Sequence, residues 1–540
     1  MKLLIIGFDG ATFNLIRPWA KAGYLPNLAK LMEIGVHGDL LSTLPPVTSP
    51  AWPTFMTGVN PGKHDVFDFI QPSGANFTLV NATRIKQATI WQRLDKLGHR
   101  VGVMNVPVTY PPAKLENGFM ISGILSPVNA QISQPADLLK RYQDGLRPYR
   151  VAPHIQYKPG NEDAFIADIY DLIKTRGEWA VKLLESEPLD VFMAHFIAMD
   201  IMKHALWRFM DHHHPRYEPS PYEHAIRDGY KLVDHYIGEL MSRLPANAHT
   251  IVMSDHGFGP LHNMVNLNIY FLQTGLMKLK PNVITQIKAW AFKKGITPSQ
   301  AYQLLGKMGL QNIVTRVSKN TRNSIVGKFL SFDSVDWGKT IAYSMGHVGQ
   351  VYINVEGKSP FGKGAVSQAN YAAARQKVID TLMALRDKNG RSLVTNIIPG
   401  NEAYHGPYAQ KGPDLHVVLD EYNMIACPLF ATDGKVISQQ IRGDSGCHRS
   451  EGIFLAHGPN IKQGVQLPTH NILDLAPTIM HMLGEPVPRI MDGRVLTDIF
   501  TTAGDITYSD DESDALTDNH QLSEAEAAEV EARLKGLGYL

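Results

Sequence analysis

The sequence predicts an α/β fold in which a central, mostly parallel sheet is covered by helices on both faces. Short apolar runs typical of buried strands recur along the chain, and amphipathic helical patterns lie between them. Strands that alternate with helices are typical of parallel sheets. Acidic, histidine and hydroxyl side chains also stand next to several of these runs. Functional residues of parallel sheets gather at the carboxyl ends of the strands.

The predicted strands are short apolar runs, the first of which ends in a glycine. They lie at residues 2–7, 101–106, 189–196, 250–254, 351–355, 414–419 and 452–457. Helical patterns, in which apolar residues recur every three or four positions, lie at 25–35, 88–99, 165–186 and 222–244. This order predicts a three-layer α/β core that comprises residues 1–260 and 341–500.

Two segments depart from the alternation. Residues 261–340 contain basic helical patterns without clear strands, and we interpret them as a helical cap insertion over the site. Their charges are better explained as a solvated face than as a binding patch. Residues 501–540 begin as an acidic polar linker and end in a predicted helix, where Ser523 and Glu526 have capping-box spacing.

The composition excludes several classes of protein. The 540 residues include 52 Lys and Arg against 51 Asp and Glu, so no basic excess indicates a nucleic-acid or membrane surface. Two cysteines, Cys427 and Cys447, are too few for a disulfide framework and fit a reducing compartment. No apolar run has the length of a signal peptide or a membrane span. We therefore expect a soluble cytoplasmic enzyme, and the oligomeric state stays open.

Six acidic and histidine residues stand beside the predicted strands or at a helix start. They are Asp9, Asp200, His204, Asp255, His256 and His448. Each one alone is better explained as a turn, cap or structural residue. Together, mixed carboxylate and imidazole ligands suit Zn²⁺, Mn²⁺ or Fe²⁺ better than Ca²⁺ or Mg²⁺. Six ligands suffice for two metals with positions left open for a substrate.

A hydroxyl nucleophile is predicted in the segment 45–58, which contains Thr48 and Ser49. Two metals ~3.5–4 Å apart can clamp the attacking and leaving oxygens of an in-line displacement. A hydroxyl that contacts one metal becomes a usable nucleophile without a separate general base. Thr48 is our candidate for that role, and Ser49 is the alternative.

The ordered set of motifs resembles the alkaline phosphatase superfamily. The motifs are Asp9, the TSPAWPTFMTGxxPxxH segment, the DxxxH pair of Asp200 and His204, SDHG at 254–257 and the late GxHRxxGIF. Within the superfamily they are most similar to the type I phosphodiesterase/nucleotide pyrophosphatase family. SDHG alone is moderately specific, whereas the ordered set is highly specific, and the resemblance extends from residue 1 to about residue 500.

The resemblance implies a ligand set and a mechanism. One metal would be held by Asp200, His204 and His448. The other would be held by Asp9, Asp255 and His256, with Thr48 nearby or bound. Thr48 would attack phosphorus and form a phosphothreonine intermediate, which water would then hydrolyse. Zinc is the favoured metal and manganese the alternative.

Two departures from the family pattern limit the substrate. In the resembled family, an Asn downstream of the nucleophile helps to hold a phosphate oxygen, but residues 64–69 (HDVFDF) contain no Asn. This weakens the transfer of nucleotide diesters as substrates. The sulfatase pattern CxPxR is also missing, because Thr48 and Trp52 stand at its Cys and Arg positions. A small-molecule phosphate mono- or diester is therefore the expected substrate.

Three further residues are candidates for substrate binding: Ser49, Lys203 and Arg449. Lys203 and Arg449 lie beside predicted ligands and could neutralise a phosphate, although a solvent or structural role is equally compatible with their positions. Two alternatives to hydrolysis stay open. The same metals could serve a phosphomutase or phosphotransferase, or the fold could be a non-catalytic binding module. The complete ligand set argues against the binding module.

Overall fold

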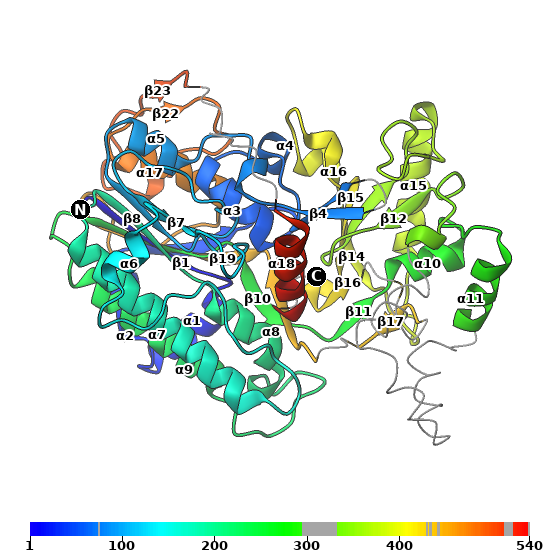
Figure 1. The fold of residues 1–540 in the computed structure, drawn as a ribbon, viewed down its shortest axis with the longest axis horizontal. Helices are drawn as coiled ribbons and strands as arrows, with labels where there is room; N and C mark the ends of the chain where they lie inside the picture. The colour runs from blue at the N-terminus through cyan, green and yellow to red at the C-terminus, as the bar shows by residue number, and fades with distance from the viewer. Residues whose placement is uncertain are drawn as a thin grey trace.

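The computed structural model describes residues 1–73, 76–293, 332–427, 430, 435–439, 443–511 and 522–537. Within these ranges the chain builds two large sheets, each with its own hydrophobic core (Figure 1). No helix in these ranges is both long enough and apolar enough to cross a membrane. The large sheet with helices on both faces confirms the predicted α/β fold class.

The larger sheet has ten strands, of which five neighbouring ones at its centre run parallel. In spatial order these five are β9 (His249–Met253), β1 (Leu3–Phe8), β8 (Val191–Phe196), β5 (Val101–Met104) and β6 (Phe119–Ile121). Antiparallel strands adjoin both sides, namely β19 (Glu451–His457) and β7 (Ser133–Gln134). Beyond β19 lie β2 (Val36–Leu41), β20 (Val465–Gln466) and β21 (His470–Asn471).

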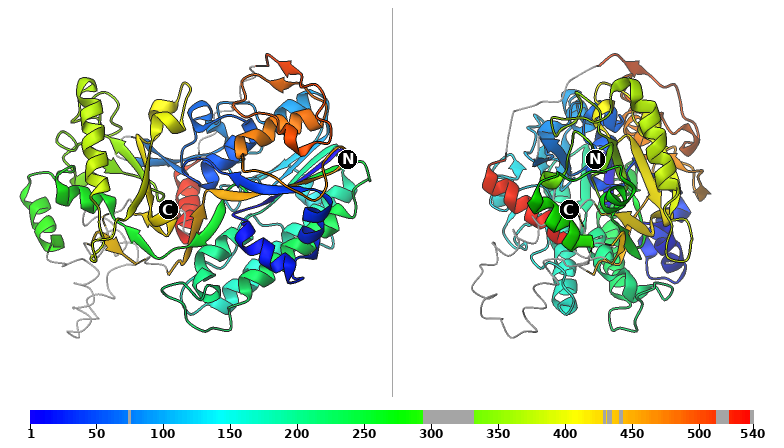
Figure 2. Two further views of the ribbon diagram at one scale, coloured as in Figure 1. Left: turned by 180° about the vertical axis from the view of Figure 1, so that it is seen from behind. Right: turned by 90° about the vertical axis from the view of Figure 1, so that its right-hand side faces the viewer.

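Helices cover both faces of this sheet, which gives the three layers (Figures 1 and 2). One face carries α3 (Thr48–Thr57), α5 (Ile90–Lys96) and α17 (Leu475–Met482). The other carries α1 (Phe13–Lys21), α2 (Pro26–Ile34), α7 (Glu162–Ser186), α8 (Ala198–Met210) and α9 (Ala225–Met241). Because both faces are covered, β1 is buried along its whole length and reads as the continuous apolar run LLIIGF.

The register of the central strands brings three strand ends together. Phe8 at the end of β1 pairs with Phe196 at the end of β8, and Gly7 pairs with Met253 at the end of β9. The residues that follow these strands therefore meet at one edge. Asp9 follows β1, Asp200 lies in the first turn of α8 after β8, and Asp255 follows β9.

The second large sheet has seven strands and its own apolar core, which the sequence analysis did not anticipate. In spatial order it contains β12 (Ala342–Ser344), β13 (Gln350–Ile353), β15 (Leu415–Leu419), β16 (Met424–Ala426), β11 (Asn263–Val265) and β17 (Ile437–Ser438), with β14 (Val394–Pro399) on β15. Helices α10 (Leu267–Thr274), α11 (Val283–Lys293) and α15 (Tyr371–Met383) accompany it (Figure 1). Two of the predicted strands, at 351–355 and 414–419, thus belong to this sheet and not to the parallel one.

The cap and tail boundaries stay a prediction. Of the basic helical patterns in 261–340, α11 is described, and the two that fall within 294–331 lie outside the described residues. The final helix, α18 (Glu524–Leu537), begins with reciprocal bonds between Ser523 and Glu526, and Val530 and Leu534 are fully buried. Arg533 donates to the carbonyl oxygens of Ile124 and Ser126. This helix therefore packs on the core of the larger sheet.

Smaller elements complete the described chain. The short helices are α4 (Pro61–His64), α6 (Leu138–Tyr142) and α16 (Gly400–Ala403). The remaining paired strands are β3 (Ile70–Ser73) with β4 (Asn76–Leu79), β10 (Gly257–Pro260) with β18 (Gly446–Arg449), and β22 (Val487–Pro488) with β23 (Tyr508–Ser509). The β10 and β18 pair matters for function because it carries His448 to the edge formed by β1, β8 and β9.

Candidate active site

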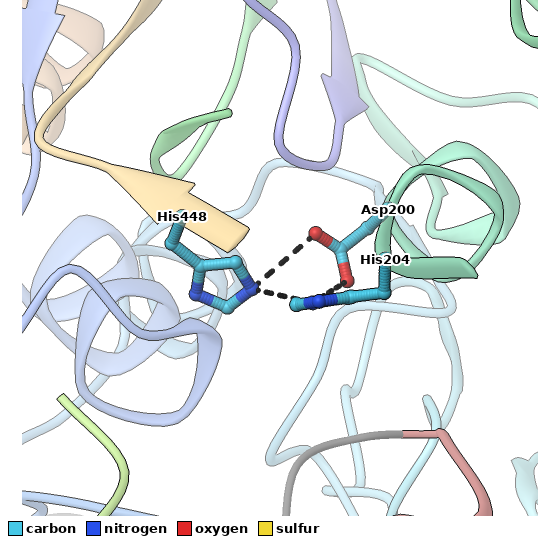
Figure 3. Close-up of side chains that lie close together, drawn as sticks. All are labelled: Asp200, His204 and His448. Carbon is cyan, nitrogen blue, oxygen red and sulfur yellow. Dashed lines mark hydrogen bonds and ion pairs between the residues drawn. The ribbon is translucent and has the colours of Figure 1, made fainter. Parts of the chain in front are cut away.

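One group of metal-competent side chains joins helix α8 to strand β18 (Figure 3). Asp200 and His204 are one turn apart on α8, and His448 comes from β18. The Nε2 atoms of His204 and His448 lie 2.9 Å apart. The carboxylate of Asp200 lies 3.6 Å from His204 Nε2 and 3.5 Å from His448 Nε2. The structure thus assembles the three residues that the sequence assigned to one metal.

A second group shares Asp200 and adds Asp9 and His256. His256 Nε2 lies 3.7 Å from Asp9 Oδ1 and 3.3 Å from Asp255 Oδ2. The imidazole of His256 also stacks on that of His448, with ring centroids 3.7 Å apart. The six predicted ligands therefore form one continuous buried cluster, in which Asp200 lies between the two groups.

The hydrogen bonds of the three histidines fit metal binding. The Nδ1 atoms of His204, His448 and His256 lie 2.9 to 3.0 Å from backbone carbonyl oxygens. A nitrogen that faces a carbonyl must donate, so each neutral ring presents the lone pair of Nε2 to the cluster. Asp9 Oδ1 and Asp255 Oδ2 are buried and accept no hydrogen bond from any described residue. Lone pairs that face one another without donors suit one or more divalent cations.

The charges of the buried acids also favour a bound cation. Burial raises the pKa of Asp9 well above its usual value, and the neighbouring carboxylates of Asp255 and Asp200 raise it further. Burial also raises the pKa of Asp255. Lys203 is a buried cation beside these acids, and burial lowers its pKa to about 8 although the charges of Asp200, Asp9 and Asp255 raise it. A bound cation would relieve this crowding of negative charge.

The turn after β1 depends on a glycine. Gly10 has a positive φ of +61°, and a Cβ placed on it would lie 2.8 Å from Asp200 Oδ1 and 2.9 Å from Lys203 Nζ. Its N–H lies 3.3 Å from Asp255 Oδ1 and donates to it. Gly10 therefore lets the backbone approach the acids closely, which a side chain would prevent.

The two hydroxyl candidates differ in their surroundings. Thr48 is the first residue of α3, is fully buried, and its Oγ lies 3.2 Å from His256 Nε2. Ser49 is equally buried, but its Oγ has no hydrogen-bond partner among the described residues. Of the two hydroxyls, the one of Thr48 is thus the one that contacts a predicted ligand.

The basic candidates Lys203 and Arg449 are engaged with backbone. Lys203 Nζ donates to the carbonyl oxygen of Gly10 and lies 3.4 Å from that of Asp9. The guanidinium of Arg449 donates to the carbonyl oxygens of Tyr422, His448 and Pro260 and to Asn423 Oδ1, each at 2.8 to 2.9 Å. In this structure both side chains therefore hold, by hydrogen bonds, the backbone segments next to the candidate ligands.

Two residues that hold Asp9 were not identified from the sequence. His195 Nε2 lies 2.9 Å from Asp9 Oδ2, and Trp52 Nε1 donates to the same oxygen at 3.3 Å. His195 Nδ1 lies 3.0 Å from the carbonyl oxygen of Asn105. The one sequence feature that could have identified His195 is that it is a single histidine within the otherwise apolar strand β8. Groups that orient a ligand in this way commonly tune metal affinity.

The profile of the family described as type I phosphodiesterase/nucleotide pyrophosphatase matches residues 3–426. The chain is therefore a phosphoric ester hydrolase of the alkaline phosphatase superfamily. Within that superfamily, it belongs to the type I phosphodiesterase/nucleotide pyrophosphatase family. No curated protein matches the sequence.

Solved structures of ectonucleotide pyrophosphatase/phosphodiesterase 5 resemble the chain at 14% sequence identity, over 93% of this chain and 100% of theirs. The human protein aligns with a TM-score of 0.49. The murine protein aligns with a TM-score of 0.47, and its inactive form in complex with AMP with 0.48.

Proposed function

We propose that the protein hydrolyses a phosphate mono- or diester at a two-metal site, through a covalent phosphothreonine intermediate on Thr48. The family supports a phosphoric ester hydrolase, and the buried cluster of three acids and three histidines supports metal dependence. Zinc is the favoured ion, because mixed imidazole and carboxylate ligands suit it, and manganese is the alternative. Nucleotide phosphate esters fit the family, although residues 64–69 contain no Asn.

The observation that carries the proposal is the position of the Thr48 hydroxyl against His256. Thr48 Oγ lies 3.2 Å from a ring nitrogen that also faces Asp9 and Asp255. A nucleophile must lie beside the group that activates it, and this one lies at the edge of a candidate metal group. Ser49, the alternative nucleophile, has no such contact among the described residues.

The ligand residues would hold two cations, with Asp200, His204 and His448 on one side and Asp9, Asp255 and His256 on the other. When bound, the metals would supply positive charge to the nucleophile, the leaving oxygen and the phosphoryl oxygens. Thr48 Oγ would attack phosphorus, the bond to the ester oxygen would break, and water would later release phosphate from Thr48. The amino end of α3 begins at Thr48, so its backbone N–H groups could also face the phosphoryl oxygens.

The test compares Thr48→Ala with Ser49→Ala in metal-reconstituted protein, using bis(4-nitrophenyl) phosphate and 4-nitrophenyl phosphate as probes. Thr48→Ala should abolish 4-nitrophenolate release while metal content and thermal melting stay near wild type. Ser49→Ala should retain most of the activity. Activity that survives Thr48→Ala but not Ser49→Ala would assign the nucleophile to Ser49. Hydrolysis in ¹⁸O-labelled water should place label in the released phosphate, whereas transfer to another alcohol would indicate a phosphotransferase.

A further inference from the structure

A cavity of about 660 Å³ is lined by residues from two segments, 65–84 and 343–414, and the second segment includes strands of the second sheet. The segment after α4 provides one wall, which includes Asp65 and Phe67. Strands β12 and β13 of the second sheet provide another, which includes Tyr343 and Tyr352. Neither the candidate metal ligands nor Thr48 line this cavity, so it would not take part in bond breaking itself.

The cavity nevertheless adjoins that cluster. Asp68 lines both the large cavity and a small one of about 40 Å³, and the small cavity is also lined by His204 and His448. Asp68 is held in place because Gln350 Nε2 donates to its Oδ2 at 3.0 Å and the Phe69 N–H donates to its Oδ1 at 2.6 Å. Asp68 is therefore shared by the linings of the two cavities, next to His204 and His448.

The walls of the cavity are aromatic. Phe67 packs edge-on against Tyr404, with ring centroids 5.0 Å apart, and Tyr343 stacks on Tyr352 at 5.3 Å. The hydroxyls of Tyr404 and of Tyr371, which also lines the cavity, are already used within the protein. Tyr404 Oη donates to the carbonyl oxygen of Leu44, and Tyr371 Oη donates to Asp414 Oδ1. Aromatic walls of this kind favour a flat apolar group.

The cavity also contains an excess of positive charge at one place. Asp65 Oδ2 accepts from Arg84 Nη2 and Lys411 Nζ, each at 2.9 Å. The carboxylate is buried with 1% of its side chain exposed, whereas the two cations are 27% and 44% exposed. One carboxylate neutralises only one of them, so the pair retains a net positive charge on the side that faces the open cavity. Planar guanidinium and ammonium groups together recognise carboxylates and phosphates.

The lining also includes Asp68, Asp414 and Lys358, so the positive excess is local to the place where Arg84 and Lys411 meet Asp65. Asp414 accepts from Tyr371 and from the N–H of Ile353, both at 2.6 Å, and burial raises its pKa. Lys358 adds a further cation to the lining. Asp68 lies at the junction with the small cavity and is held by Gln350. The ligand chemistry is therefore apolar along the rings and anionic near Arg84 and Lys411.

We propose that this cavity binds one organic group of the phosphate ester substrate, and that it selects a flat ring bearing a second anionic group. The anion, a carboxylate or a second phosphate, would lie against Arg84 and Lys411, and the ring would lie among Phe67, Tyr343 and Tyr352. This inference rests on the proposed function, because the first phosphoryl group is placed at the metal-candidate residues. It defines the substrate as a molecule with two separated anions.

The experiment uses non-hydrolysable phosphonates and zinc-loaded full-length protein. The probes are phenylphosphonate and biphenyl-4-phosphonate, each compared by isothermal titration calorimetry with its analogue bearing a carboxylate at the far end of the ring system. Two ring lengths are used so that one can span the two anion positions. For at least one length, the carboxylate should tighten binding about tenfold, as expected of a partly buried charge-assisted contact.

The variant Lys411→Gln should reduce that preference at least about threefold, because it removes one of two cations. Lys231→Gln is the matched control, since Lys231 is 48% exposed, pairs with Asp228 and does not line the cavity. Equal affinity for both members of each pair overturns the inference, as does a preference that Lys411→Gln leaves unchanged. If the zinc-loaded wild type shows the carboxylate preference but does not hydrolyse the 4-nitrophenyl esters, the proposed function alone is refuted.

Discussion

The two sheets of this protein handle charged side chains in opposite ways. At the edge of the larger sheet, Asp9 and Asp255 are fully buried, and each keeps one carboxylate oxygen without a hydrogen-bond donor among the described residues. In the second sheet, Asp414 is satisfied by Tyr371 and a backbone N–H, and exposed pairs such as Arg391 with Asp420 lie at its surface.

Under the proposed function, this difference corresponds to a division between chemistry at the larger sheet and substrate recognition at the second sheet. Burying a carboxylate without a partner is costly, so it persists where an external cation can complete the site. Asp414 and the pair of Arg391 with Asp420 already have partners within the protein, so they do not require a bound ion. We expect changes at the edge of the larger sheet to affect metal content and turnover. Changes in the second sheet should affect substrate preference or have little effect.

Among the candidate metal ligands and the groups around them, a large effect is expected for Asp255→Asn, which removes a buried charge 3.3 Å from His256 Nε2. Because substitution of groups that merely orient a ligand already costs about 10–100-fold, removing this acid should lower kcat/KM at least about a hundredfold. Elemental analysis should find less bound metal per chain. The exposed change Asp137→Asn is the control, since that side chain is 66% exposed. Full metal content and activity in Asp255→Asn would remove Asp255 from the ligand set.

A smaller effect is expected for His195→Leu, which removes the partner of Asp9 Oδ2 at 2.9 Å without removing any predicted ligand. Metal affinity should fall about 10–100-fold, as for other groups that orient a metal ligand. His195→Gln keeps a polar group that can form a hydrogen bond with Asp9 and should lie closer to wild type. Zinc affinity measured against a competing chelator checks both variants. Equal loss in both would mean that packing in β8, and not the contact to Asp9, is what matters.

The boundary between the two regions can be tested with Asp68→Asn. Burial raises the pKa of Asp68 to about 7 from an ordinary value of 3.8. Because the folded pKa is the higher one, the folded state binds more protons between these values, and this stabilisation is lost as the pH rises toward about 7. The asparagine variant does not titrate. The melting temperature of the wild type should therefore fall relative to the variant by a few degrees between about pH 5 and pH 8.

If the melting temperatures of the two proteins change with pH in the same way across that range, Asp68 titrates with an ordinary carboxyl pKa. In that case, the junction between the two cavities is more open to water than its hydrogen bonds to Gln350 and Phe69 indicate. The measurement is differential scanning fluorimetry in buffers of constant ionic strength.

The smallest effect is expected for Arg391→Ala in the second sheet region. The side chain of Arg391 is 55% exposed and pairs with Asp420 and Asp387. Exposed ion pairs contribute about 0–1 kcal/mol, so thermal stability and kcat/KM should both stay near wild type. A strong loss of turnover in this variant would contradict the division of roles between the two sheets.

Much of the fold and of the ligand cluster could be predicted because local patterns encode them. The run LLIIGF is apolar along its length because β1 is buried on both faces, and the alternation with helices indicates a parallel sheet. The six predicted ligands stand beside strands or at a helix start, and such positions meet at one edge of a sheet. Their roles as ligands, and that of Thr48 as nucleophile, stay predictions that the geometry supports.

Only the tertiary structure decided which strand pairs with which. The strands predicted at 351–355 and 414–419 carry apolar residues as the parallel strands do, so their sequences do not reveal that they form a second, largely antiparallel sheet. The contact of His195 with Asp9 and the cavity between the two sheets likewise join residues far apart in the chain. The physical reason is that periodicity records which face of an element is buried, whereas packing decides against what it is buried.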